Sequence, residues 1–538
     1  MARSTTDTCC LTLPFKLEKW QEDLLSKRFE IARQIYNTLV SYELKKKYRI
    51  ENSKEFRALK KQMAELDIKS NVQDRKQYNK LKAQCRNLYE KGIKEKDNSS
   101  NNEPDTKYIG INEYAFKHDI SEFYKYFGEN IGSSVAVHGI APQVWAAFNK
   151  VVIEGKGKRI HFKKPGELNS LRGFSASGGK SGGVEIMYRE NSKKGNIGPH
   201  IEWKELLLPL KIDPNNIYET EMLSHRIKYV RIIRKPGKNK PHWYAQLSLE
   251  GKPAVKRNKN DGSFKHPVGH GDVGIDIGPQ TIAYSSSSEV NLLELADQVK
   301  NIEQQKRLLQ RKMDRSRRAT NPDNYNENGT IKRGVKLTRN KSKRYLQLQK
   351  ELAHIQYVQA ETRKRQHTLL ANHLLSLGDR FYVEDMTWPS LASRAKNTEI
   401  SEKTGKIKRK KRFGKSIANK APATLITILS TKSKSLGIPG VVKIKTSAKA
   451  SQYNHLTKEY VAKRLDERWN SMPDGKKIQR DIYSAFLLQY IDPQTNKFNQ
   501  EALQQNYPQF VKMHDQTINR LSALPKTIAS MGIKRSIC

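Results

Sequence analysis

The sequence is short of cysteine and of long apolar runs. Its 538 residues include four cysteines, none of them in a Cys-x-x-Cys pair, so neither a disulfide framework nor a Cys-x-x-Cys zinc knuckle is expected. Apolar stretches such as residues 425–429 are far shorter than the ~18–20 residues that a membrane-spanning helix needs. The apolar run at residues 9–15 contains Pro14 and is unlike a secretory signal. The lack of long apolar runs favours a protein that has no membrane partner. The lack of a disulfide framework favours a reducing cytoplasm as its location.

Acidic residues are scarce relative to basic ones. The chain has 100 Lys and Arg against 55 Asp and Glu, which gives a formal net charge of +45 and an isoelectric point near 9.9. Such a charge repels itself unless a polyanion neutralises it, and it is typical of nucleic-acid-binding proteins. The length and the 36% hydrophobic content still allow three to five domains with real cores.

The first 150 residues predict a strand followed by helices. Residues 10–15 form the strand, and apolar side chains then recur at helical spacing from Leu24 to Tyr42. A second helical stretch from about residue 54 to 91 stops at Gly92, and residues 94–105 are expected to form a solvated loop. A further helix begins at Pro142, a residue favoured in the first helical turn.

The next part of the chain is predicted to be rich in strands. Residues 227–233 and 243–249 carry β-branched and aromatic side chains and flank a Pro-Gly-Lys-Asn turn at 236–239, which predicts a hairpin. We expect residues 175–249 to form a β-barrel or sandwich, to which the strand at residues 10–15 returns.

A third segment, which combines predicted strands with charged helices, begins at Gly271. Strands are expected at residues 273–277, 281–284, 292–295, 381–383 and 441–444. Two charged helices, at about residues 296–318 and 342–377, separate the third strand from the fourth, and Gly378 ends the second helix.

Three acidic residues stand at informative places in this third part. Asp276 lies in Gly-Ile-Asp-Ile-Gly on the first strand, and Glu384 ends the fourth strand, with Asp385 facing the other side. Asp481 begins a later apolar helix. One acid on the first strand, one on the fourth and one on a later helix match an RNase H-like nuclease site, in which two Mg²⁺ ions roughly 3.5–4 Å apart drive phosphodiester hydrolysis. Hard Mg²⁺ or Mn²⁺ prefers carboxylate oxygen, so Asp276, Glu384 and Asp481 are the candidate catalytic residues and metal ligands.

The order of these motifs resembles the three RuvC motifs of the TnpB family, the RNA-guided nucleases of insertion sequences that are related to compact type V CRISPR effectors. The motifs are Gly-Ile-Asp-Ile-Gly at 274–278, Tyr-Val-Glu-Asp at 382–385 and Gln-Arg-Asp-Ile-Tyr-Ser-Ala at 479–485. The similarity extends over most of the chain, through residues 140–144, 156–164, 308–316, 413–417, 421–422 and 451–452.

The resemblance implies a multidomain α+β fold with an RNase H-like (RuvC) nuclease domain built on a mixed β-sheet, a β-barrel wedge-type domain and a helical recognition domain. In these terms residues 1–15 are the first wedge strand, 16–150 the helical recognition domain, 151–270 the wedge and 271–446 the nuclease domain with a basic helical insertion. Residues 447–478 are a target-nucleic-acid-binding-like insert, 479–498 the third-motif helix and 499–538 a C-terminal helical tail.

The resemblance also implies the partners and the location. They are a guide RNA, either an omega-type RNA or a CRISPR RNA, and target double-stranded DNA, with one protein monomer per guide in a prokaryotic cytoplasm. The candidate nucleic-acid-binding residues are basic and lie in three clusters: Lys156, Lys158, Arg159, Lys163 and Lys164; Lys306, Arg307, Arg311, Lys312, Arg315, Arg317 and Arg318; and Lys408, Arg409, Lys410, Lys411 and Arg412.

Two positions depart from the family pattern. Residues 447–477 contain no cysteine and one histidine, His455, so we expect no structural zinc and an ordinary surface or loop position for His455. This segment should instead hold its shape by packing one helical face, formed by Tyr453, Tyr460, Val461, Leu465 and Trp469. The third motif carries Tyr483 where the family commonly has Asn.

Ordinary structural roles and other functions compete with this interpretation. Asp276 and Glu384 would serve as capping or surface acids, Asp481 as a helix N-terminal acid, and the basic run at 406–411 as a solvated loop or an import signal. The alternative functions are a nuclease-inactive RNA-guided DNA-binding repressor, a guide-free RuvC-type nuclease and an actin-fold ATPase. The ATPase is disfavoured because the Asp-Gly pairs at 261–262 and 474–475 lie in polar turns.

Overall fold

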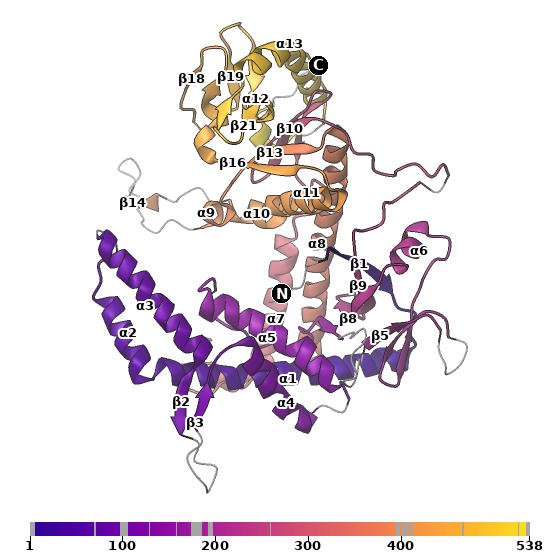
Figure 1. Ribbon diagram of the computed structural model, residues 1–538, viewed down its shortest axis with the longest axis vertical. Coiled ribbons are helices and arrows are strands. Elements are labelled where there is room, and N and C mark those ends of the chain that lie inside the picture. Colours follow the sequence, from indigo (N-terminus) through magenta and orange to yellow (C-terminus); the bar gives the residue numbers. More distant parts are fainter. Residues whose placement is uncertain are drawn as a thin grey trace. The chain divides into compact units, whose positions relative to one another are not determined.

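The structure is a computed structural model of a mixed α+β chain with many helices (Figure 1). It describes residues 6–68, 71–96, 106–127, 130–157, 159–173, 186–191, 197–258, 260–393, 399–400, 407–408, 413–464, 467–525 and 527–533. The chain divides into two compact units, Met1–Ala254 and Val255–Cys538. In the described part of the chain, every helix is too short or too polar to cross a membrane.

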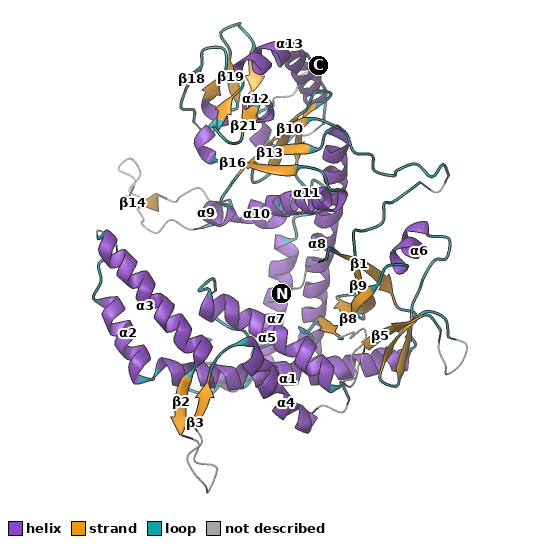
Figure 2. Ribbon diagram, viewed as in Figure 1, coloured by secondary structure: helices purple, strands orange, loops and turns teal. Residues whose placement is uncertain are grey.

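Helices make up most of the first 150 residues, as the sequence predicts (Figure 2). The helices of the first unit are α1 (Lys19–Glu51), α2 (Lys54–Ala64), α3 (Val72–Lys91), α4 (Glu113–Phe127), α5 (Ala141–Phe148) between the π-helical turns η1 (Val135–Ile140) and η2 (Asn149–Ile153), and α6 (Ile217–Leu223). The stretch from 54 to 91 is two helices rather than one, because Asn71 caps a new helix by accepting hydrogen bonds from the backbone of Gln73 and Asp74.

The segment predicted to be a solvated loop, residues 94–105, begins within one strand and is followed directly by another. Strands β2 (Ile93–Lys96) and β3 (Thr106–Ile109) pair as an antiparallel hairpin, and residues 97–105 lie outside the described residues. The polar composition of this segment hid the hairpin, because its short strands carry charged residues that are not typical of strands.

The remaining strands of the first unit form two sheets. They are β1 (Thr8–Pro14), β4 (Ser170–Arg172), β8 (Ile227–Lys235) and β9 (His242–Glu250), in the order β1-β9-β8-β4, and β5 (Ile186–Arg189), β6 (His200–Trp203) and β7 (Leu206–Pro209). The predicted hairpin of β8 and β9 and the predicted return of the first strand to this module are both confirmed.

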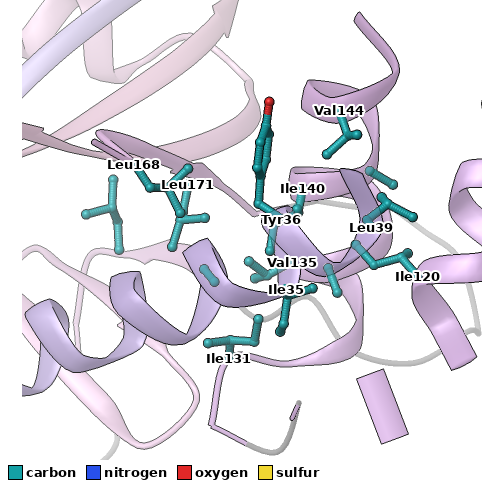
Figure 3. Packing of buried hydrophobic residues seen from close by; sticks show 14 of the residues in the cluster. Ile35, Tyr36, Leu39, Ile120, Ile131, Val135, Ile140, Val144, Leu168 and Leu171 are labelled. Atoms are coloured by element: carbon teal, nitrogen blue, oxygen red, sulfur yellow. The ribbon is translucent and has the colours of Figure 1, made fainter. Parts of the chain in front are cut away.

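A continuous apolar core joins helices and sheet in the first unit. Ile35 and Leu39 of α1 pack with Ile140 and Val144 of the η1–α5 helix, and Leu171 of β4 belongs to the same core (Figure 3). All five side chains are fully buried. The core thereby fixes the η1–α5 helix beside the edge strand β4.

The second unit is built on a five-stranded mixed sheet. Its strands are β10 (Asp272–Ile277), β11 (Thr281–Ser285), β12 (Val290–Glu294), β13 (Arg380–Glu384) and β16 (Gly440–Ile444), in the order β12-β11-β10-β13-β16. The first three pair antiparallel, whereas β13 and β16 run parallel to β10. The five strands expected from the sequence are therefore confirmed.

Helices cover both faces of this sheet. The helices of the second unit are α7 (Glu303–Thr320), α8 (Lys343–Leu377), α9 (Trp388–Ala392), α10 (Gly414–Lys420), α11 (Pro422–Leu436), α12 (Arg480–Gln489) and α13 (Gln500–Ser522) with the 3₁₀ turns η3 (Pro322–Asn324), η4 (Thr446–Ala448), η5 (Ala450–Gln452) and η6 (Ala529–Met531). Val273, Ile275 and Ile277 share one core with α8 and α11, while the opposite face packs against α12 and α13.

Gly378 follows α8, as predicted, but for a different reason than a left-handed cap. Its backbone is extended, with φ −179°. A Cβ atom there would lie 2.4 Å from the carbonyl oxygen of Gly271, the residue before β10. Glycine is therefore required because the end of α8 lies directly against the backbone at the start of β10.

The helix predicted within residues 447–477 is wrong. The segment forms short strands, β17 (Tyr453–Asn454) with β18 (Glu459–Tyr460), and β19 (Trp469–Ser471) with β20 (Lys477–Gln479). Tyr460 and Val461 are about half exposed, at 53% and 50%, and Leu465 lies outside the described residues. Tyr453 is buried against Phe498, with ring centroids 4.6 Å apart, and the Trp469 indole N–H donates to the carbonyl of Gly532 at 2.8 Å.

The other short strands of the second unit form two further hairpins. They are β14 (Glu399–Ile400) with β15 (Ile407–Lys408), and β21 (Ile491–Asp492) with β22 (Lys497–Phe498).

Candidate active site

Asp276 and Glu384 lie at the same level of two neighbouring parallel strands. The paired part of β10 and β13 ends with Ile275 opposite Val383, and the next step along both strands brings Asp276 beside Glu384. Since side chains alternate along a strand, both acids point away from the apolar face that holds Ile275 and Val383. The carboxyl ends of two parallel strands thus bring two carboxyl groups together.

Helix α12 packs on the face of the sheet that carries these acids. Its first turn holds Asp481, which is 9% exposed. The close approach depends on Gly274, two residues before Asp276, because a Cβ atom there would lie 1.9 Å from the carbonyl oxygen of Ala485. The glycine of the Gly-x-Asp pattern therefore serves helix-on-strand contact rather than the approach of a ligand.

We predict that Gly274→Ala destabilises the second unit by about 1–3 kcal/mol, the usual range for overpacking a close contact. The clash is with backbone atoms of Ala485 and Gln489, which cannot move without displacing α12. Urea unfolding measures the change. Gly198→Ala, at a position with open space around it, is the matched control and should leave the unfolding midpoint in place.

Asp276 lies within the electrostatic influence of the other two acids. Burial, followed by the negative charges of Asp481 and Glu384, raises the pKa of the Asp276 carboxyl well above its usual range. The Arg480 guanidinium and a hydrogen bond with Ser484 act in the opposite direction. Burial also raises the pKa of Glu384, against a hydrogen bond from the backbone of Ala450. Such mutual repulsion in a partly buried site is the situation that a bound cation would relieve.

Two arginines contact Asp481, and sequence reasoning did not find them. The Arg468 guanidinium donates to one carboxylate oxygen at 3.3 Å, and Arg480 donates to the other at 3.1 and 3.2 Å. Within the described residues, no three His, Cys, Asp or Glu side chains are already arranged to hold one ion. The donor chemistry still fits a hard cation such as Mg²⁺, because all three side chains offer carboxylate oxygens.

Asp385 faces away from this cluster, as the alternation of strand residues predicts. It is exposed, and its carboxylate accepts an ion-pair contact from Lys443 at 2.8 Å. Glu384 and Asp385 are therefore adjacent in sequence but differ fully in environment.

Tyr483, the departure from the family pattern, points into the core rather than toward the acids. It is 1% exposed, and its hydroxyl oxygen accepts the backbone N–H of His455 at 3.0 Å and lies 2.6 Å from the His455 Nδ1 atom. His455, which the sequence suggested was an ordinary surface or loop residue, is fully buried. Burial lowers the pKa of His455 to about 4, so its ring is neutral at pH 7.

The predicted basic helix exists as α7, but its seven cations are not equivalent. Lys306 pairs with Glu303 at 3.4 Å, while Arg317 and Arg318 both pair with Asp314. The other four, Arg307, Arg311, Lys312 and Arg315, are exposed and have no ion pair among the described residues. Arg307, Arg311 and Arg315 recur every four residues and so share one helix face.

The other two basic clusters lie only partly within the described residues. Lys156 is exposed and lies 3.0 Å from Glu154, Lys163 lies over the Tyr36 ring at 4.9 Å, and Arg159 and Lys164 are exposed. Lys408 is in β15, whereas Lys158, Arg409, Lys410, Lys411 and Arg412 lie outside the described residues.

Comparisons with known proteins give low similarity. No family model and no curated protein matches the chain. A solved Cas12f1–sgRNA–target DNA complex is 12% identical, with a TM-score of 0.37, and the match covers 91% of this chain and 99% of that chain. A CRISPR–Cas12f ternary complex is 13% identical, with a TM-score of 0.22 and coverage of 92% and 100%. Both TM-scores are below 0.5, so neither likeness establishes a shared fold.

Proposed function

We propose that this chain is an RNA-guided DNA endonuclease, which uses a guide RNA to find target DNA next to a short adjacent motif and cleaves it in an RNase H-like, RuvC-type site. The observation that carries the proposal is the convergence of Asp276, Glu384 and Asp481 on one face of a mixed sheet, from its first strand in chain order, its fourth strand and a later helix. The net charge of +45 supports a polyanionic partner.

In this proposal Asp276, Glu384 and Asp481 hold Mg²⁺ or Mn²⁺. When bound, two such ions activate a water and stabilise the leaving 3′ oxygen of a phosphodiester. The chain itself supplies the carboxylates, and interactions with Ser484 and with the backbone of Ala450 favour the charged forms of Asp276 and Glu384. Arg468 and Arg480 keep Asp481 paired with positive charge, so an ion at this carboxylate would compete with the two arginines for its oxygens.

The arginine contacts also favour a second candidate, a nuclease-inactive RNA-guided DNA-binding repressor. If Asp481 stays paired with Arg468 and Arg480, the chain keeps its nucleic-acid affinity without cutting. In an RNA-guided protein, base pairing with the guide recognises the target sequence, while the protein recognises the shape of the duplex and a short adjacent motif. This recognition does not depend on cleavage.

Purification of the protein with its native RNA tests the proposal. A structured RNA with a variable end should co-purify, and the complex should cut a matching plasmid when Mg²⁺ is added. Stable target binding without cutting would favour the repressor. Absence of any bound RNA, with cutting retained, would instead indicate a guide-free nuclease.

The free arginines of α7 predict a strong salt effect on binding. Changing Arg307, Arg311 and Arg315 to Glu should flatten the slope of log affinity against log salt concentration by about 2–3, since each phosphate contact contributes about −0.9 on duplex DNA. Fluorescence anisotropy over a salt series measures the slope. The control reverses three exposed lysines of α2 and α3, namely Lys54, Lys61 and Lys76. Equal slopes for both triple variants would mean that this helix face is only solvated.

A further inference from the structure

A small basic cavity lies in the first unit, where the η1–α5 helix meets the edge strand β4. Its volume is about 300 Å³, and it is lined by His138, Gly139, Pro142, Gln143 and Ala146 from the helix and by Ser170, Arg172 and Arg231 from the strands. None of these residues belongs to the acidic site or to the basic clusters described above.

The two arginines of this cavity face each other across paired strands. Arg172 of β4 is the register partner of Arg231 of β8 in an antiparallel pair. Side chains directly opposite in such a pair have Cβ atoms about 4.5–5.5 Å apart, and like charges there are destabilising. The register therefore places two cationic side chains on the same face of neighbouring strands, where an anion would relieve their repulsion.

No carboxylate within the described residues pairs with either arginine. Arg172 lies over the Tyr229 ring at 3.9 Å, and its Nε atom is buried without a hydrogen-bond partner. Arg231 makes one long hydrogen bond, to Gln246 at 3.4 Å. The stacked ring fixes the plane of the Arg172 guanidinium while leaving donors available.

The walls of the cavity are rigid. A Cβ atom on Gly139 would lie 2.5 Å from the carbonyl oxygen of Arg172, so glycine allows the helix to touch the strand edge. The Gln143 amide bridges both elements, donating to the carbonyls of Gly139 at 3.1 Å and Ser170 at 3.3 Å. Ile140, Val144 and Leu171, each next in sequence to a residue of the cavity wall, belong to the apolar core (Figure 3).

The third titratable side chain of the cavity, His138, adds no positive charge at pH 7, because its pKa is lowered from the ordinary value of 6.5. Burial, followed by the charges of Lys117 and Arg172, lowers the pKa of His138. Lys117 itself pairs with Glu113 at 2.6 Å, which leaves Arg172 and Arg231 as the cations that line the cavity wall.

We propose that Arg172 and Arg231 form a phosphate-binding site that grips one backbone phosphate of a nucleic acid bound by the first unit. Two planar guanidinium forks on adjacent strands match the oxygens of a phosphodiester, which neutralises their mutual repulsion. The cavity is roomy enough for a phosphate and its neighbouring sugar. This inference requires that the chain binds nucleic acid, as the proposed function states, but it does not require cleavage.

Affinity measurements on the full chain test the site. The probes are a fluorescein-labelled 30-nucleotide poly-dT strand and a 30-bp DNA duplex, followed by fluorescence anisotropy. We expect Arg172→Ala with Arg231→Ala to weaken binding of at least one probe by about 10- to 100-fold or more, since the loss of one charged hydrogen bond alone accounts for about that range. Replacing both arginines by Lys should give an intermediate loss, since charge remains but the fork is gone.

A matched control separates the site from general charge. Arg57→Ala with Arg75→Ala removes the same charge from exposed positions on α2 and α3, and should change affinity by about threefold or less. Without nucleic acid, the melting temperature of the Arg231→Ala variant should equal or exceed that of the unchanged chain, because the repulsion between Arg172 and Arg231 is relieved. This combination, weaker binding without lost stability, would not arise from a purely structural arginine.

Two results would overturn the proposal. One is an equal loss of affinity in the cavity variant and the control variant. The other is unchanged nucleic-acid affinity together with an arginine-dependent rise in melting temperature on adding inorganic phosphate, which would make the cavity a site for free phosphate. Because these readouts need no cutting, failure of the nuclease assignment would appear separately, in the Mg²⁺-dependent cleavage assay.

Discussion

Replacing Asp276 with Ala should abolish Mg²⁺-dependent DNA cleavage, with a loss of about a thousandfold or more, as expected when a residue of an interdependent catalytic set is removed. Asp276 is central to the acidic cluster, because it feels the charges of both Asp481 and Glu384. Its loss removes a carboxylate that the proposed ions need. Guide RNA and target DNA should still bind, since the basic residues lie elsewhere.

The fold should tolerate this change. The raised pKa of Asp276 means that its charged form is disfavoured in the folded protein, so the carboxylate costs stability above its unfolded pKa. The melting temperature of the Asp276→Ala variant at pH 7 should therefore equal or exceed that of the unchanged chain. Loss of cutting together with retained or raised stability distinguishes a functional acid from a structural one.

Asp385→Ala is the matched control for this experiment. Asp385 follows Glu384 directly, yet it is exposed and pairs with Lys443 on the other side. The Asp385→Ala variant should cleave DNA at close to the normal rate, whereas Glu384→Ala should lose cleavage as Asp276→Ala does. Full cleavage by the Asp276 variant, in a supercoiled-plasmid assay with Mg²⁺, would end the nuclease assignment.

The strands that carry Asp276 and Glu384 were predictable because their signal is local. Apolar residues in 273–277 and 381–383 predict strands, and their positions in the sequence put one acid on the first strand and the other at the end of the fourth. The glycine at 274 was also visible, although its role depends on the approach of Ala485 from a helix more than 200 residues away. A single sequence does not encode that approach in any local pattern.

Contacts between distant segments explain what sequence reasoning missed. Arg468 reaches Asp481 only because the β19–β20 hairpin folds back on the start of α12. The helical spacing of 460, 461, 465 and 469 was misleading, since short segments with turns satisfy a helical period by chance. The Arg172–Arg231 pair likewise depends on the register of β4 against β8, which has no signature in either strand.

Tyr483 should matter for stability rather than for the chemistry of the acids. Positions two apart on a helix do not share a face, so Tyr483 points away from the side that holds Asp481. Tyr483→Ala should cost about 3–5 kcal/mol of unfolding free energy, the usual range for emptying a large buried aromatic site. Tyr483→Phe keeps the ring but leaves the His455 backbone N–H without its acceptor, and should cost about 1–3 kcal/mol.

In urea unfolding, the free energy of unfolding should be lowest for Tyr483→Ala, higher for Tyr483→Phe and highest for the unchanged chain. Tyr460→Phe is the control, because that ring is 53% exposed, and it should stay within about 0.5 kcal/mol of the unchanged chain. At low temperature, where Tyr483→Phe remains folded, its cleavage rate should match that of the unchanged protein. A Phe variant that is fully stable but cuts slowly would contradict this assignment, since it would mean that the Tyr483 hydroxyl acts on the acidic cluster through His455.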